Sequence, residues 1–451
     1  MHIVIVGDGK LGHSLARRLA EEGYDIVLVD KNADLLRASG NTLDIGCVCG
    51  NGLNAEVLTE AGVPEADLLI AVTSTDEINI LCCLVARRLG ARHTIARVRD
   101  PECAKIVLSM REELGLSMTL NPEQAAATEI ARIIRFPSAM KVDFFAKGRV
   151  EMVEVKVAAG SPLIGQPLAE LYRKFHTRVL VCAVQRDGEV TIPRGDFVLQ
   201  EGDLISLTAT PNEITQLFRV LGLIGPKART AMIVGGGRVS FYLAQQLIEA
   251  GIHVKIIEQN RQRCEELSDK LPRATVILGD GSDRETLREE GMAEADVLVA
   301  LTGLDEENVV ISMYAIADHV RKVIAKINHI TFGEILEKTG IECVITPHLI
   351  AAGRILRYVR AMQSSVSSSM EALSKIVNEK VEAIEFRVRE GFAGRDVPLK
   401  ELKLKKNLLV ASITRGGKLI LPSGDDSIQE GDSVVVVTTL VGLEKLDDIL
   451  A

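Results

Sequence analysis

The chain carries two copies of each of two different sequence units. Residues 1–30 read MHIVIVGDGKLGHSLARRLAEEGYDIVLVD and residues 232–258 read MIVGGGRVSFYLAQQLIEAGIHVKIIE, so that Gly7 aligns with Gly235 and Asp30 with Glu258. Residues 185–207 read QRDGEVTIPRGDFVLQEGDLISL and are similar to residues 414–436, TRGGKLILPSGDDSIQEGDSVVV. The order of units is therefore A–B–A′–B′, which restricts the fold to a tandem of two unlike domain types.

The length of 451 residues predicts two to four domains, and the repeat divides the chain into four domains joined by two connecting segments. The triplet Asn121-Pro122-Glu123 is typical of a helix start, because a capping side chain precedes proline and an acid in the first turn. The polar run 363–369 predicts a flexible linker. The predicted boundaries are 1–122 for A, 123–140 for a connecting helix, 141–226 for B, 229–346 for A′, 347–379 for a connecting helix and linker, and 380–451 for B′.

Segment A alternates short apolar strands with amphipathic helices. Near-continuous apolar strands such as IVIVG and LLIAV are typical of a parallel sheet covered on both faces. Leu11, Leu15 and Leu19 give one helical stripe after the first strand. We therefore predict that A and A′ are α/β domains with a Rossmann-like, doubly wound parallel sheet.

Segment B has short alternating strands, turn signals and one helical stretch near residues 168–175, which predicts a small α+β domain. Two of its turns carry acids, Glu201-Gly-Asp203 and Glu430-Gly-Asp432. A solvated turn is expected at both, with a cation site as the alternative.

The first A unit contains a dinucleotide-binding fingerprint in its proper context, between a strand and a helix and with an acid closing the next strand. Gly7 permits the tight turn, Gly9 lets backbone amides approach a pyrophosphate, and Gly12 lets helix and sheet pack closely. The phosphates are expected at the positive end of a helix over residues 8–22. Asp30 is placed to bind both adenosine ribose hydroxyls and would repel a 2′-phosphate, so NAD(H) is favoured over NADP(H).

Further residues at the ends of strands are candidates for the same site. Asn51 lies between two glycines and can reach an adenine edge, with a plain turn as the alternative. Thr73 and Ser74 end a strand at the carboxyl edge of the sheet, where ligands bind, but they can equally cap the helix that starts at Asp76. Arg97 is expected to pair with phosphate or, alternatively, to form a structural salt bridge.

Composition and missing motifs exclude other classes of protein. The net charge of −9 and an aromatic content of 3% without tryptophan argue against a nucleic-acid surface, and no apolar run is long enough to span a membrane. Cys47 and Cys49 suggest a metal site only weakly; buried thiols and no metal are expected. No catalytic motif such as YxxxK, HExxH or a P-loop is present, so a ligand sensor is favoured over an enzyme. An NAD-dependent oxidoreductase with duplicated domains, or a scaffold with vestigial sites, are the alternatives.

The ordered duplication and several motifs resemble the TrkA family of Trk potassium uptake systems, whose members carry tandem RCK domains (regulators of potassium conductance). The resemblance spans the chain and rests on GDGKLG (7–12), Asp30, EADLLIAVTSTDEIN (65–79) and ARVRDPE (96–102). It implies a cytoplasmic subunit attached peripherally to the inner face of the membrane. It also implies a homo-oligomeric ring, expected to be a tetramer, that gates a potassium-translocating membrane subunit as NAD(H), and in relatives ATP or ADP, binds.

The residue patterns and the resemblance together give the predicted binding residues of both copies. In the first copy they are Gly7, Asp8, Gly9, Lys10, Leu11, Gly12, Asp30, Asn51, Thr73, Ser74 and Arg97. In the second copy they are Gly235, Gly236, Gly237, Arg238, Val239, Glu258, Asp280 and Thr302. The second copy departs from the first where Ser240 replaces the third glycine, Gly303 replaces Ser74 and Lys326 replaces Arg97. We expect it to bind a nucleotide still, with a different affinity or preference.

Overall fold

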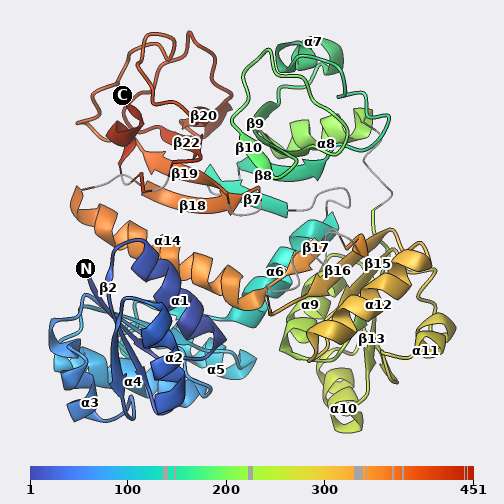
Figure 1. Ribbon diagram of the computed structural model, residues 1–451. Coiled ribbons are helices and arrows are strands. Elements are labelled where there is room, and N and C mark those ends of the chain that lie inside the picture. Colours follow the sequence, from blue (N-terminus) through green and yellow to red (C-terminus); the bar gives the residue numbers. More distant parts are fainter. Residues whose placement is uncertain are drawn as a thin grey trace. The chain divides into compact units, whose positions relative to one another are not determined.

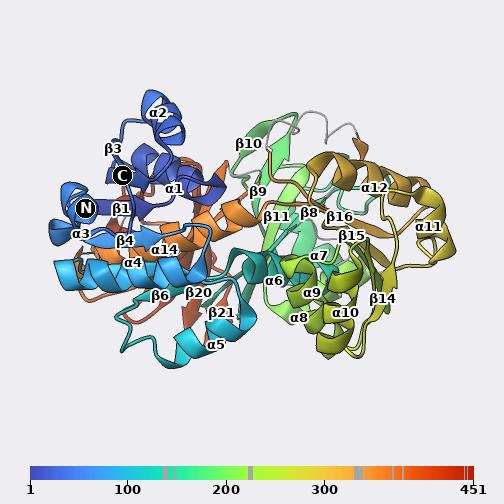
Figure 2. The same cartoon turned by 90° about the horizontal axis from the view of Figure 1, so that it is seen from below.

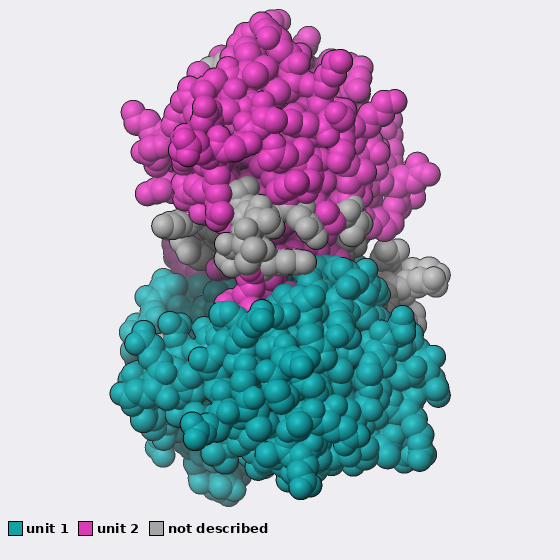
Figure 3. Space-filling view, turned by 90° about the vertical axis from the view of Figure 1, so that its left-hand side faces the viewer, with its two compact units in different colours: residues 1–130, 230–356 teal, residues 131–229, 357–451 magenta. Residues whose placement is uncertain are grey.

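The computed structural model describes the chain apart from residues 136–140, 147–148, 222–226, 330–338, 342, 368–369, 378–379, 441 and 444. The chain separates into two compact units, each assembled from two distant parts of the sequence (Figures 1 and 3). Unit 1 is Met1–Ile130 with Thr230–Leu356, and unit 2 is Ala131–Arg229 with Arg357–Ala451. The two A segments therefore form one unit and the two B segments the other.

The first lobe of unit 1 contains a six-stranded parallel sheet of order β3-β2-β1-β4-β5-β6. Its strands are β1 (His2–Val6), β2 (Asp25–Asp30), β3 (Gly46–Cys49), β4 (Leu68–Ala71), β5 (His93–Arg97) and β6 (Met118–Leu120). Its helices are α1 (Lys10–Glu21), α2 (Ala33–Thr42), α3 (Ala55–Glu60), the 3₁₀ turn η1 (Val63–Glu65), α4 (Asp76–Leu89) and α5 (Pro101–Ser109). The strand order reverses between β1 and β4, which creates a crevice at their carboxyl ends.

The predicted hydrophobic pattern explains how the helices cover this sheet. Four residues of β1 and all four of β4 are buried, as expected of strands covered on both faces. Leu11, Leu15 and Leu19 of α1 are buried against them. Figure 2 shows α1 and α2 on one side of the sheet and α4 on the other. The doubly wound fold predicted for segment A is confirmed.

The second lobe of unit 1 repeats this plan with the order β14-β13-β12-β15-β16-β17. Its strands are β12 (Thr230–Val234), β13 (His253–Glu258), β14 (Thr275–Leu278), β15 (Val297–Ala300), β16 (Lys322–Lys326) and β17 (Cys343–Ile345). Its helices include α9 (Arg238–Glu249), α10 (Arg261–Lys270), α11 (Arg284–Glu289) and α12 (Asp305–Ala317). The duplication seen in the sequence is thus a duplication of a complete sheet.

Two helices leave unit 1 at equivalent places. Helix α6 (Pro122–Arg135) begins where Asn121 Oδ1 accepts from the Gln124 N–H at 2.8 Å, as the sequence predicted. Helix α14 (Pro347–Ser367) runs for 21 residues without a break. The flexible linker predicted over 363–369 is therefore wrong as far as Ser367, because the polar residues continue the helix; 368–369 lie outside the described residues.

Unit 2 contains two antiparallel sheets of order β10-β9-β11-β8-β7 and β18-β19-β22-β20-β21. The first domain consists of β7 (Lys141–Phe145), β8 (Val150–Lys156), η3 (Leu168–Glu170), α7 (Leu171–Phe175), β9 (Leu180–Arg186), β10 (Glu189–Thr191), β11 (Leu204–Ala209) and α8 (Pro211–Val220). The second consists of β18 (Met370–Ile376), β19 (Val381–Arg387), β20 (Leu408–Arg415), β21 (Lys418–Ile420), β22 (Ser433–Thr438) and η5 (Leu446–Ile449). Strand β18 lies in the range predicted as helix and linker, and α8 was not predicted.

Two buried glutamates join these domains reciprocally. Glu154 of β8 accepts from the Val377 N–H at 2.9 Å, and Glu385 of β19 accepts from the Ala146 N–H at 3.1 Å. Val377 and Ala146 both have positive φ, at 51° and 49°, in the turns that follow β18 and β7. Since a buried amide without a partner is costly, each glutamate stabilises a strained turn of the other domain.

The two acidic turns of unit 2 are exposed at Glu201-Gly202 and Glu430-Gly431, as predicted, but the aspartate that ends each turn is buried. Arg186 holds the Asp203 carboxylate through Nε and Nη2, both at 2.8 Å, and Arg415 holds Asp432 in the same way at 2.9 and 2.8 Å. Both carboxylates are only 1% exposed. A guanidinium fork already satisfies each acid, so neither turn offers a cation site.

Two further sequence predictions concern cysteines and membrane spans. Cys47 and Cys49 are exposed, not buried as predicted, because β3 is the edge strand of its sheet. Within the described residues, no group of three or more His, Cys, Asp or Glu side chains is arranged to hold a metal ion. Among the same residues, no helix is long and apolar enough to cross a membrane.

Asp203→Asn is expected to lower the free energy of unfolding of unit 2 by about 1–3 kcal/mol, because it leaves a partly buried guanidinium without its anion. Burial alone would raise the pKa of Asp203, but the Arg186 and Gln200 hydrogen bonds lower it overall. Asp203 therefore stabilises the fold above the ordinary aspartate pKa, and this stabilisation is lost as the pH falls through the lowered value. Thermal unfolding from about pH 7 to pH 2 tests this against Glu201→Gln in the same turn. An equal loss at all pH values would contradict it.

Candidate functional site

The loop that follows β1 has the geometry of a phosphate-binding turn. Gly7 has φ +110°, and a Cβ on it would lie 3.0 Å from the Thr73 N. A Cβ on Gly12 would lie 1.8 Å from the Gly7 carbonyl oxygen, so the first turn of α1 packs directly on the loop. Gly9 precedes α1 and has open space around its Cβ position. The loop thus needs glycine for its own shape at two positions, and at Gly9 only a ligand would need it.

The carboxylate at the end of β2 fixes this loop. Asp30 Oδ2 accepts from the Asp8 N–H at 2.7 Å, and Asp30 Oδ1 accepts from the Asn32 N–H at 2.8 Å. Asn32 in turn caps α2 through Asp34 and Leu35. Asp30 therefore lies between the glycine loop and a helix start, with its carboxylate at the mouth of the crevice.

A cleft of about 560 Å³ opens at this place, within the size range of small-molecule sites. Nine predicted residues line it: Gly7, Gly9, Lys10, Leu11, Asp30, Asn51, Thr73, Ser74 and Arg97. Asp8 and Gly12 do not, because the Asp8 side chain is buried beneath the loop and Gly12 packs against it. Asn51 Oδ1 accepts from the Leu53 N–H at 3.2 Å, so it also forms the turn given as the alternative.

The strand-end hydroxyls are not helix caps. The residue that precedes α4 is Thr75, whose side chain makes no capping bond. The Thr73 N–H and hydroxyl both donate to Asn79 Oδ1, at 2.8 and 2.7 Å. The Arg97 Nη2 donates to the Thr73 carbonyl. The Asn79 side chain therefore ties the end of β4 to helix α4, and Thr73 and Ser74 remain on the cleft wall.

Cations of the second lobe lie close enough to Arg97 and Lys10 to affect pKa values. The pKa of Arg97, which lines the cleft, is lowered to about 10 by burial and by the nearby Arg99 and Arg238, against the opposing effects of Glu123 and Asp76. Arg97 Nε is buried without a hydrogen-bond partner. Burial likewise lowers the pKa of Lys326, with Lys10 acting in the same direction. An anion bound between these groups would relieve their repulsion and desolvation.

The second lobe contributes directly to the first lobe's cleft. Asn328, Pro347 and His348 line it together with Pro122 and Glu123 of the first lobe. Burial, followed by Lys10, Arg18, His329 and Arg17, lowers the pKa of His348 to about 4, so its imidazole is neutral at pH 7. The starts of α6 and α14 therefore both lie on the cleft wall.

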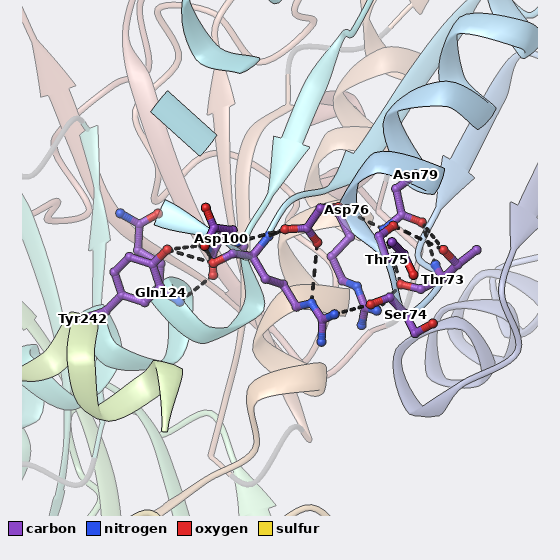
Figure 4. Close-up of polar contacts among 11 residues, drawn as sticks. Thr73, Ser74, Thr75, Asp76, Asn79, Asp100, Gln124 and Tyr242 are labelled. Atoms are coloured by element: carbon purple, nitrogen blue, oxygen red, sulfur yellow. Dashed lines mark hydrogen bonds and ion pairs between the residues drawn. The ribbon is translucent and has the colours of Figure 1, made fainter. Parts of the chain in front are cut away.

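A chain of hydrogen bonds leads from the rim of the cleft to α9 of the second lobe (Figure 4). The Arg99 Nη2 donates to the Ser74 carbonyl, and Asp76 Oδ2 accepts from the Arg99 and Asp100 N–H groups at 2.7 and 2.8 Å. The Tyr242 hydroxyl donates to the Arg99 carbonyl and accepts from Asn121 Nδ2, both at 2.9 Å. If a ligand displaces Ser74 at the end of β4, these hydrogen bonds would transmit the displacement to α9, the helix that follows the second glycine loop.

The second glycine loop repeats the first with local differences. Gly235 has φ +99°, Gly237 precedes α9, and Arg238 and Val239 form its first turn. Glu258 Oε2 accepts from the Gly236 N–H at 2.6 Å and Oε1 from the Asn260 N–H at 2.7 Å, matching Asp30. Ser240, in place of the third glycine, donates to the Gly235 carbonyl and so fastens the loop by a hydrogen bond.

Asp280 and Thr302 also lie at strand ends of the second lobe. Asp280 Oδ1 accepts from the Ser282 N–H and hydroxyl at 2.9 and 2.8 Å, and the Thr302 N–H donates to Asn308 Oδ1 at 2.8 Å. These contacts repeat the arrangement of Asn51, Thr73 and Asn79. A role for them in ligand binding stays a prediction.

Several cleft residues were missed by the sequence. Lys31 and Leu35 line the cleft just after Asp30, and their position next to the predicted ribose acid was a usable signal. Asn328 and His348 had no such signal, because they lie more than 200 residues from the glycine loop and the histidines were interpreted as surface or packing residues.

The fold is that of a duplicated α/β protein, with a cleft at the glycine loop of the first copy. Residues 3–122 and 231–347 match the TrkA-N domain, and residues 152–222 and 374–451 match the TrkA-C domain. The chain is 32% identical over 450 residues to a Trk system potassium uptake protein TrkA homolog of Archaeoglobus fulgidus, covering all of both chains. It is 34% identical over 439 residues to the Trk system potassium uptake protein TrkA of Halomonas elongata, covering 97% and 95%. The chain belongs to the TrkA family, as its motifs indicated.

A solved structure supports the fold alone. The GsuK channel bound to NAD matches 97% of this chain and 76% of its own chain, with a TM-score of 0.64 and 20% sequence identity. The GsuK RCK domain matches with a TM-score of 0.63 and 20% identity, covering 97% and 92%. The tandem arrangement of RCK-type domains is therefore confirmed.

Gly9→Ala is expected to abolish nucleotide binding at the first site, leaving one binding event per chain, while the unfolding temperature stays nearly unchanged, because the Cβ has open space unless a pyrophosphate approaches. Gly12→Ala is the contrasting variant: its Cβ meets the Gly7 carbonyl, so it should lower the unfolding temperature as well. Calorimetry with NADH and ADP, combined with thermal unfolding, tests both. Undiminished binding by Gly9→Ala would contradict the assignment of the loop.

Asp8→Asn is expected to stabilise the chain near pH 7 and not near pH 3. Burial raises the pKa of Asp8, despite the Ser39 hydroxyl donating at 2.7 Å and His13 lying 3.8 Å away. An acid with a raised pKa binds more protons in the folded state, so stability falls as the pH rises above the ordinary aspartate value. Chemical unfolding at both pH values measures this, with exposed Asp34→Asn as the control. A destabilised variant at pH 7 would show that Asp8 is stabilising when ionised.

Proposed function

We propose that this protein is a nucleotide-binding regulatory subunit of a potassium uptake system. The observation that carries the proposal is the half-buried Arg97, whose Nε is buried without a hydrogen-bond partner, beside a glycine loop and a strand-end acid in one cleft. Arg97 and the glycine loop suit the phosphates of an adenine nucleotide, and Asp30 suits its ribose. The relatives' names supply the potassium system, and the cleft supplies the ligand class: NAD(H), with ATP or ADP as further candidates.

The arrangement suits a switch because the cleft belongs to two lobes. Lys10 and Arg97 of the first lobe approach Lys326 and Arg238 of the second closely enough to depress pKa values, so their separation changes when an anion enters. Helices α6 and α14 start on the cleft wall and continue into unit 2. A ligand that favours one spacing of the lobes therefore shifts the directions of both helices.

A binding role is favoured over catalysis. The residues that would meet the far end of a dinucleotide are a neutral histidine, an asparagine and the starts of two helices, His348, Asn328 and Glu123 among them. These groups position a ligand and report its presence. Both curated relatives described above are named as potassium uptake proteins, which agrees with regulation.

The proposed partners are a Trk-type membrane subunit and other copies of this chain. Leu81 of α4 and Val310 and Met313 of α12 are 41–47% exposed on helices that cover the sheets. Apolar side chains on such faces favour association into a homo-oligomeric ring, for which a tetramer is the working expectation. The ring would lie against the inner face of the membrane through its transport partner.

Potassium flux through the reconstituted membrane subunit, titrated with NADH, NAD, ATP and ADP, tests the proposal. Asp30→Ala removes the charged acceptor for the ribose and should raise the half-saturating nucleotide concentration by about tenfold to a hundredfold. The exposed Asp34→Ala, on the same loop-to-helix segment, should behave as wild type.

Two outcomes would contradict the proposal. Flux that ignores all four nucleotides would remove the switch. Steady oxidation of NADH in the presence of carbonyl compounds, followed at the nicotinamide absorbance band, would favour the oxidoreductase instead.

A further inference from the structure

The two proposed nucleotide sites differ in charge at the position five residues after the ribose acid. Leu35 and Arg263 both stand five residues after that acid and occupy the first turns of α2 and α10, behind the capping residues Asn32 and Asn260. Leu35 lines the first cleft and is 44% exposed. The equivalent place in the second lobe therefore holds a guanidinium instead of an apolar side chain.

Arg263 is held at the second site by the glycine loop itself. Its Nε donates to the Gly236 carbonyl oxygen at 2.7 Å, while the N–H of the same glycine donates to Glu258 Oε2 at 2.6 Å. The Arg263 Nη1 donates to Glu266 Oε2 at 2.8 Å, which fixes the plane of the guanidinium. The Gly236 peptide groups thus bond an acid on one side and a cation on the other. The side chain of Arg263 is 29% exposed.

The first site has the opposite balance at this place. Asp8 replaces Gly236 and brings a buried carboxylate close enough to Asp30 for the two to repel. Lys31 follows Asp30 and also lines the cleft, as a point charge on a flexible side chain. The first site thus has Asp30, Lys31 and Leu35 on its wall with Asp8 buried beneath the loop, whereas the second has Glu258 and the Arg263 guanidinium bonded to its loop.

We infer that the second site accepts an adenosine ribose carrying a 2′-phosphate, as in NADPH, whereas the first site rejects it. This inference rests on the proposed function, since it names the ligand class of one of its two sites. A carboxylate at the end of the second strand binds ribose hydroxyls and repels a 2′-phosphate, and a nearby arginine accommodates that phosphate. Arg263 supplies a charge-assisted partner for the phosphate and offsets Glu258.

The test is calorimetry of the full chain with NADH and NADPH, in an Asp30→Ala background that weakens the first site. NADPH is expected to bind at least as tightly as NADH. Arg263→Leu, which copies the first lobe's own residue, should weaken NADPH by about tenfold to a hundredfold and NADH by less than about threefold. Arg263→Lys keeps the charge without the fork and should fall between them.

The reciprocal change tests the first site. In a Glu258→Ala background, wild-type Leu35 should give NADH binding without NADPH binding, and Leu35→Arg should bring NADPH affinity within about tenfold of NADH. Circular dichroism checks that each variant is folded.

The outcomes separate this inference from the proposed function. Equal losses of NADH and NADPH in Arg263→Leu would make Arg263 a general contact to the base or ribose and overturn the inference, leaving nucleotide regulation intact. NADH binding by the second site with no NADPH binding would overturn it as well. Absence of all nucleotide binding by the wild-type chain would overturn both.

Discussion

The pairing of a strand-end carboxylate with the amide of a glycine loop organises both halves of unit 1. Asp30 binds the Asp8 N–H and Glu258 binds the Gly236 N–H, at 2.7 and 2.6 Å. In each lobe the second carboxylate oxygen binds the amide that precedes a helix. One acid thus fixes the loop and the helix start in each lobe, and a ribose hydroxyl would meet a carboxylate that is already oriented.

The duplication places two such loops in one unit and gives the first cleft a wall from the second lobe. Arg97 on this cleft is close enough to Arg238 of the second lobe for its pKa to be lowered, in addition to the larger effects of burial and Arg99. That arrangement is poorly satisfied without an anion, which is a physical reason for it to change when a nucleotide binds. The polar chain through Arg99 and Tyr242 links the same cleft to the helix behind the second loop.

The sequence predicted what local patterns determine. The tandem order, the doubly wound sheets and nine cleft residues followed from the repeat, the apolar strands and the glycine spacing. Contacts across the fold were not predictable: His348 reaches the cleft only through tertiary packing, and Asp203 meets a guanidinium from another strand. Cys47 was misjudged because nothing local marks β3 as an edge strand. The polar run after Gln363 continued a helix, since composition alone does not end one.

The central claim is that Asp30 and Glu258 each bind the ribose hydroxyls of one nucleotide. Titration calorimetry with NADH and with ADP on the wild-type chain, Asp30→Ala, and Asp30→Ala combined with Glu258→Ala tests it most directly. The account predicts two binding events per chain, then one, then none. Binding of unchanged stoichiometry and affinity in the doubly substituted chain would contradict it.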